Sequence, residues 1–136
     1  MSEIKLLFLI GMIFCHIVDD YYLQGWLANA KQRAWWKINA PNPLYKYDYL
    51  MALFMHSFSW SFMVMLLPTY YVFNSQFATD YGLIAMQVIA MFIVNLIIHF
   101  ETDNAKANLG KINLIQDQTI HMAQIFVTWL YLVVIR

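Results

Sequence analysis

Charged residues are scarce in this chain. Of its 136 residues only 12% are Asp, Glu, Lys or Arg, while 62% are hydrophobic. This composition is too apolar for an average soluble domain, and the length is too short for two ordinary domains. The formal net charge is zero, so the basic surplus typical of nucleic-acid-binding proteins is missing. We therefore expect one membrane domain over residues 1–136, with the lipid bilayer around it and no nucleic-acid partner.

Cysteine is nearly absent as well. Cys15 is the single cysteine, which excludes an intramolecular disulfide and a Cys-based zinc motif. The first apolar run begins like a signal peptide but has no small-residue cleavage site. We expect this run to be retained as a membrane helix.

Four apolar runs stand out, and each is near the length of about 20 residues that a membrane helix needs. A basic connection with the break Pro41-Asn42-Pro43 follows the first run, a polar turn over residues 74–80 follows the second, and a connection with Gly110 follows the third. The predicted fold is all-α, an integral membrane four-helix up-down bundle. Its predicted spans cover residues 4–27, 49–73, 82–103 and 118–135.

Polar residues recur at one-turn spacing inside these apolar runs. Asn95, His99, Asp103 and Lys106 are separated by four, four and three residues, which places them on one face of a helix. Facing lipid would cost roughly 3 kcal/mol for each charged group, so such a face is expected to point into the bundle. Similar sets occur in the other runs: His16, Asp20 and Gln24; His56 alone; and Asp117, His121 and Gln124.

These sets are expected to meet. In an up-down bundle the C-terminal ends of the first and third helices and the N-terminal ends of the second and fourth lie on one side. Imidazole and carboxylate groups on rigid helix faces are suitable metal ligands. The predicted ligands are His16, Asp20, His56, His99, Asp103, Asp117 and His121.

Seven ligands are more than one tetrahedral zinc ion needs. Either two ions bind, or some carboxylates orient the histidines or act as a general base. The expected cofactor is one or two divalent ions, zinc first, with iron and manganese as alternatives. The alternative to a metal is that each His/Asp pair is a hydrogen-bonded pair that joins two helices.

Other polar residues have candidate roles. Asp20 and Asp103 are candidate catalytic carboxylates, and one of Asp20, Asp103 and Asp117 is expected to serve as general base. Lys106 is a candidate for stabilising a phosphate or a developing oxyanion, or else a lysine that snorkels at a helix end. Asp19 and Glu101 lie off the polar faces, so we expect surface or interface charges there. Three amides either orient ligands or substrate or form interhelical hydrogen bonds: Gln24, Asn95 and Gln124.

The basic residues predict an orientation. Six of the eight fall in the two connections on the side of the polar sets: Lys31, Arg33, Lys37, Lys46, Lys106 and Lys111. By the positive-inside rule these connections are cytoplasmic, both termini lie outside, and the metal site faces the cytoplasm.

The segments HIVDDYYLQ, HFETDNAK and DQTIH, with the lone His56, resemble the domain of unknown function 3307 family of small bacterial and phage membrane proteins. The likeness covers nearly the whole chain, and it is specific because spacing and order agree in four separate helices. It implies a bacterial inner membrane location and a phage-encoded or bacterial origin, and it brings no activity with it. The residues that it selects are His16, Asp20, Gln24, His56, His99, Asp103, Lys106, Asp117, Gln118 and His121.

A looser similarity to inner-membrane metal-dependent hydrolases suggests the chemistry. The first hypothesis is a membrane-embedded hydrolase in which metal-activated water attacks an ester or phosphoester of a small-molecule or lipid substrate at the cytoplasmic interface. The second is a metal or proton carrier, and the third is a non-enzymatic protein that a metal clamps and that engages a host or partner protein. The sequence leaves the oligomeric state open, with a homo-oligomer as one alternative.

Overall fold

A computed structural model of the chain describes residues 3–75 and 80–135, and these residues form helices and no strand. The prediction of an all-helical chain is confirmed. Most of the expected turn between the second and third helices, and the basic residue Arg136, lie outside the described residues. The elements in order are α1 (Glu3–Ile17), a π-helical segment (Val18–Leu23), α2 (Leu27–Ala30), α3 (Arg33–Asn39), a 3₁₀ turn (Pro43–Tyr45), α4 (Asp48–Asn74), α5 (Tyr81–Ala107), α6 (Leu114–Trp129) and a second π-helical segment (Leu130–Ile135).

Four helical stretches are long and apolar enough to cross a membrane. They cover Glu3–Leu23, Pro43–Asn74, Tyr81–Ala107 and Leu114–Ile135, and an 18-residue window within each has a mean hydropathy of 1.6, 1.7, 2.3 and 1.5 in turn. A helix rises about 1.5 Å per residue, so even 20 residues span the hydrocarbon core of about 30 Å. Their outward faces carry large apolar side chains, such as Leu7, Phe14 and Ile97.

The first helical stretch is shorter than predicted. It ends at Leu23 rather than near residue 27, because Gly25 adopts a positive φ of 50° and turns the chain into the short helix α2. The third runs to Ala107, four residues beyond its expected end. The fourth begins at Leu114, where Asn113 and Gln116 form a reciprocal capping box.

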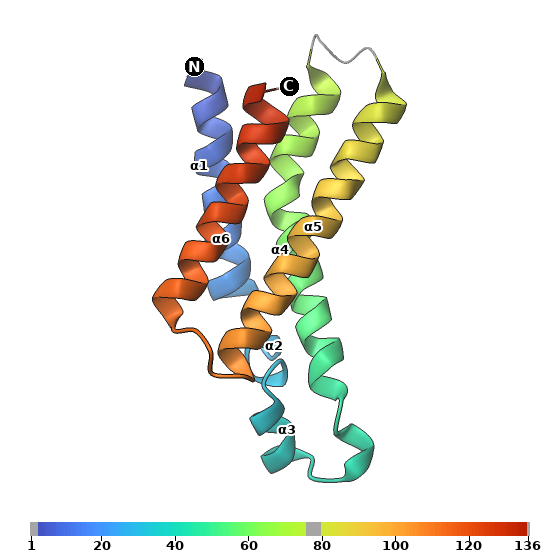
Figure 1. Ribbon diagram of the computed structural model, residues 1–136, viewed down its shortest axis with the longest axis vertical. Coiled ribbons are helices and arrows are strands. Elements are labelled where there is room, and N and C mark those ends of the chain that lie inside the picture. Colours follow the sequence, from blue (N-terminus) through green and yellow to red (C-terminus); the bar gives the residue numbers. More distant parts are fainter. Residues whose placement is uncertain (1–2, 76–79, 136) are drawn as a thin grey trace.

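The long helices pack around a shared interior. α4 contacts both α1 and α5, and α6 contacts α5 and α1. The described chain ends lie together at one end of the molecule, while α2 and α3 lie at the other (Figure 1).

The interior is divided along its length. Toward the chain ends it is an apolar core that includes Met12, Val64, Ile125 and Leu132. Toward α2 it is polar, which places the candidate site at that end of the helices.

Candidate metal centre

The four long helical stretches bring all four histidines of the chain together. The rings of His99 and His121 stack with centroids 4.2 Å apart, and those of His56 and His99 lie 5.1 Å apart. His16 completes the group, with its ring centroid 5.9 Å from that of His121. Each histidine is at most 1% exposed, so the cluster is closed to solvent.

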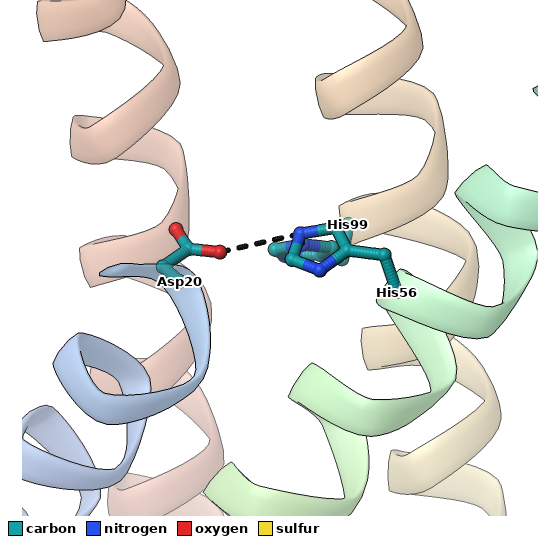
Figure 2. Close-up of side chains that lie close together, drawn as sticks. All are labelled: Asp20, His56 and His99. Carbon is teal, nitrogen blue, oxygen red and sulfur yellow. Dashed lines mark hydrogen bonds and ion pairs between the residues drawn. The ribbon is translucent and has the colours of Figure 1, made fainter. Parts of the chain in front are cut away.

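His56 Nε2 is the most crowded atom of the cluster. It lies 3.2 Å from His99 Nε2, 3.3 Å from Asp20 Oδ1 and 3.2 Å from Asp103 Oδ2. Figure 2 shows Asp20 reaching across from the first helical stretch toward the rings of His56 and His99. Four ligands bound to zinc at about 2.0–2.1 Å in a tetrahedron are about 3.3–3.4 Å from one another. The three spacings from His56 Nε2 match that range, whereas His99 Nε2 and Asp103 Oδ2 are 3.9 Å apart.

A second group of potential ligands shares residues with the first. Asp103 Oδ1 lies 3.3 Å from His121 Nε2, while its Oδ2 faces His56. Two groups of three residues thus offer ligand atoms within 4.8 Å of one another. One group is His99, Asp103 and His121, and the other is Asp20, His56 and His99. The carboxylate of Asp103 lies between the two groups.

The hydrogen bond at Nδ1 of His121 fixes which groups its Nε2 faces. The amide nitrogen of Gln124 donates to the Asn95 carbonyl at 3.1 Å, which leaves its Oε1 to accept from His121 Nδ1 at 3.1 Å. In the neutral ring the Nε2 lone pair then points at carboxylate oxygens of Asp103 and Asp117, at 3.3 and 3.5 Å. The partial negative charges of this lone pair and of the carboxylate oxygens repel one another, so a proton or a metal cation between the nitrogen and the oxygens would stabilise the arrangement.

His16 lies beside the ligand groups rather than in them. Its Nδ1 accepts a hydrogen bond from the indole nitrogen of Trp60 at 2.7 Å, and its Nε2 lies 3.0 Å from Gln118 Oε1. Both ring nitrogens are thus engaged, and Asp20 Oδ2 is 3.6 Å from Nδ1. The predicted ligand role of His16 is not supported by this geometry, because no nitrogen lone pair remains for a metal.

Asp19 is not the surface or interface charge that its sequence position indicated. Asp19 is only 1% exposed. Its Oδ1 accepts a hydrogen bond from the Ser59 hydroxyl at 2.5 Å, and its Oδ2 lies 3.9 Å from His56 Nδ1. The π-helical segment that contains it has a wider turn than an α-helix, so Asp19 and Asp20 both face the bundle. Glu101 is exposed, as expected.

Two lysines pair with the central carboxylates. Lys31, which was not predicted as a site residue, lies 2.5 Å from Asp103 Oδ2, and the two side chains are 9% and 2% exposed. Lys106 pairs with Asp117 Oδ2, so the structure gives it a buried carboxylate partner. Asn108 holds Lys31 in place by donating to its backbone carbonyl at 3.1 Å. In the sequence, the only signal for Lys31 was its place in the basic connection that follows the first apolar run.

The cluster has more carboxylates than ammonium groups. With neutral histidines, its four carboxylates and two ammonium groups leave a net charge of minus two, which a single divalent cation balances. Buried charges are costly unless they are compensated. The groups counted are Asp19, Asp20, Asp103, Asp117, Lys31 and Lys106.

Three amides predicted near the site have partners. Gln24 donates to the Asp20 backbone carbonyl. Asn95 donates to Thr128 Oγ1 at 2.8 Å and forms an interhelical link with Gln124. The contacts of Asn95 and Gln124 join α5 to α6 beside the cluster, whereas the contact of Gln24 stays at the end of the first helical stretch.

Comparison with protein-family models, curated proteins and solved structures returned no match for this chain.

Proposed function

We propose that the chain is an integral membrane protein whose four helical stretches form an up-down bundle around a divalent metal centre. The apolar outer faces of the helices support insertion into a membrane, because apolar side chains are favourable in lipid. The charged groups support it as well, because they lie inside the bundle, where they avoid the cost of facing lipid. The basic connections near the cluster support a cytoplasmic site with both termini outside. The order and spacing of the His/Asp motifs support the resemblance to the domain of unknown function 3307 family and a bacterial inner membrane location.

The crowding at His56 Nε2 is the observation that carries the metal proposal. One imidazole nitrogen holds at most one proton, yet this atom lies within 3.3 Å of three other ligand atoms. A divalent cation bound beside this nitrogen would compensate the donor atoms that crowd around it. The residues that would hold the ion form two groups that share His99: Asp20, His56 and His99, and His99, Asp103 and His121.

The mixture of imidazole and carboxylate donors suits zinc, and it also suits iron and manganese. With neutral histidines the net charge is minus two, which favours one ion over two, since a second divalent ion would leave a buried positive excess.

We propose hydrolysis of an ester or phosphoester as the activity. A divalent ion at the centre would supply a Lewis acid that polarises water and substrate. Asp117 Oδ1 is buried and, among the described residues, has no hydrogen-bond donor, so it is able to accept a proton from the attacking water. Lys106 holds the other oxygen of Asp117, and Lys31 places a second positive charge beside Asp103.

The burial of the site favours a second candidate, a metal that clamps the helices without catalysis. The side chain of Asp20 is 7% exposed, and those of His56, His99 and Asp103 are at most 2% exposed. Hydrolysis therefore requires the site to open to water and substrate, whereas a clamp does not. A carrier is less favoured, because the described interior between the site and the chain ends is an apolar core.

Elemental analysis tests the metal. Protein purified in mild detergent without chelator is expected to hold about one divalent ion per chain by the charge balance above. His99→Ala is expected to lose most of it, and Glu101→Gln, an exposed carboxylate on the same helix, is expected to keep it. Wild-type protein without metal would overturn the proposal.

The Asp117→Asn variant separates the two candidates. Loaded with metal, the wild type is expected to hydrolyse a generic phosphodiester or carboxylic ester in mixed micelles, and Asp117→Asn to lose this activity while it keeps the metal. A clamp predicts no hydrolysis by either protein, and a drop in unfolding temperature on chelation.

A further inference from the structure

A basic pocket lies outside the metal centre, where α3 leads into the 3₁₀ turn. Its volume is about 260 Å³, and three cations line it: Arg33, Lys37 and Lys46. The segments that form it lie at the end of the molecule opposite the chain ends (Figure 1). In the orientation proposed above, this is the cytoplasmic membrane interface.

The positive charge of this pocket is uncompensated. No Asp or Glu lines it, and none of the three cations forms an ion pair with a described residue. Lys46 instead lies over the ring of Tyr47, 5.0 Å from its centroid. The contrast with Lys31 and Lys106, which both pair with buried carboxylates, indicates that the pocket attracts an external anion.

The walls of the pocket are held in place without a ligand. The indole nitrogen of Trp36 donates to the Ala30 carbonyl at 2.6 Å, and its ring stacks on Tyr45 with centroids 6.4 Å apart. Asn42 accepts from the Leu44 backbone at 2.9 Å and stabilises the turn between Pro41 and Pro43. A pocket held in this way loses little conformational freedom on binding, which favours affinity.

The ligand must match both the charge and the size of the pocket. An arginine fork and two lysines form the donor set that recognises phosphate oxygens. The volume is below the range of about 300–1,000 Å³ typical of drug-sized ligands, and it suits a headgroup rather than a whole lipid. Basic pockets beside membrane helices bind anionic headgroups, and the tryptophans beside this one are typical of membrane interfaces.

We propose that the pocket lined by Arg33, Lys37 and Lys46 binds the phosphate group of an anionic ligand, of which an acidic phospholipid at the cytoplasmic interface is one source and a soluble phosphate the other. The site is independent of the metal centre and of hydrolysis there.

Titration calorimetry of the full chain in a nonionic detergent tests this proposal. The probes are dihexanoyl phosphatidic acid, dihexanoyl phosphatidylcholine and inorganic phosphate. The phosphatidic acid is expected to bind, and more tightly than the phosphatidylcholine, whose choline group offsets the phosphate charge. Binding of inorganic phosphate with similar affinity would identify a soluble phosphate as the ligand, and binding of the lipid alone would identify the headgroup.

The double variant Arg33→Gln with Lys37→Gln is expected to weaken binding at least tenfold. Both side chains are exposed, so the fold is expected to persist, and an unchanged helical circular dichroism spectrum checks this. Lys111→Gln, at an exposed lysine outside the pocket, is the matched control and is expected to bind as the wild type does. Absence of binding by both anions, or equal loss in the Lys111→Gln control, overturns the proposal.

Discussion

Replacing Lys31 by methionine is expected to destabilise the metal-free protein strongly. The substitution keeps the apolar stem of the side chain and removes the ammonium group that lies 2.5 Å from Asp103 Oδ2. Because the two side chains are only 9% and 2% exposed, water cannot replace the lost partner. Breaking a buried ion pair on one side costs about 3–5 kcal/mol. Asp103 retains contacts with His56 and His121, so a loss of about 3 kcal/mol, at the lower end of that range, is expected.

Metal loading is expected to reduce this loss. Without Lys31 the net charge of the cluster becomes minus three, so a divalent cation compensates a larger excess of negative charge in the variant than in the wild type. The difference in unfolding free energy between variant and wild type is therefore expected to shrink when metal is present. The measurement is equilibrium unfolding in mixed micelles, followed by far-ultraviolet circular dichroism, with chelator and with metal.

A double-mutant cycle isolates the pair. Asp103→Asn and Lys31→Met are each expected to destabilise the metal-free protein. The double variant is expected to lose less unfolding free energy than the two single variants lose together, and the difference, the coupling energy of the pair, is expected to be about 2 kcal/mol. Lys111→Met serves as the control for removing an exposed lysine, where a change within about 0.5 kcal/mol is expected. If Lys31→Met changes stability no more than Lys111→Met does, the buried pair does not stabilise the protein and the reasoning fails.

Three further predictions follow from single contacts. Trp60→Phe removes the donor to His16 Nδ1 and is expected to cost about 1–3 kcal/mol of unfolding free energy, measured in the same denaturation assay. Asp19→Asn leaves His56 Nδ1 without its carboxylate neighbour, so metal affinity is expected to fall about 10–100-fold in a competition titration with a chelating dye; unchanged affinity would exclude an orienting role for Asp19. Asn113→Ala removes the N-terminal cap of α6 and is expected to lower stability by about 1 kcal/mol, with metal content at wild-type level.

Local periodicity made part of the candidate site predictable. His99 and Asp103 share a face because they are one turn apart on a continuous helix, and Asp117 and His121 do so for the same reason. The apolar runs indicated helices of membrane-spanning length, since hydropathy depends on composition alone. Metal binding itself stays a prediction that elemental analysis has to test.

Other members of the cluster could not be found by periodicity. Asp19 faces His56 because the π-helical segment changes the rotation per residue, and a count of 3.6 residues per turn misses that change. Lys31 reaches Asp103 because the positive φ of Gly25 turns the chain back and Asn108 holds the returning segment. Both effects depend on backbone geometry outside the regular helix.

The sequence by itself determined where the apolar helices run and which polar residues share a face within each of them, because both properties repeat along one chain segment. Only the tertiary structure decided which atoms meet. The rotation of neighbouring helices placed Trp60 on His16 and so withdrew that histidine from the ligand groups, while Gln124 directed the free nitrogen of His121 toward carboxylates. Hydrogen bonds between segments far apart in the sequence choose among the faces that each helix offers, and that choice is not encoded in any single stretch.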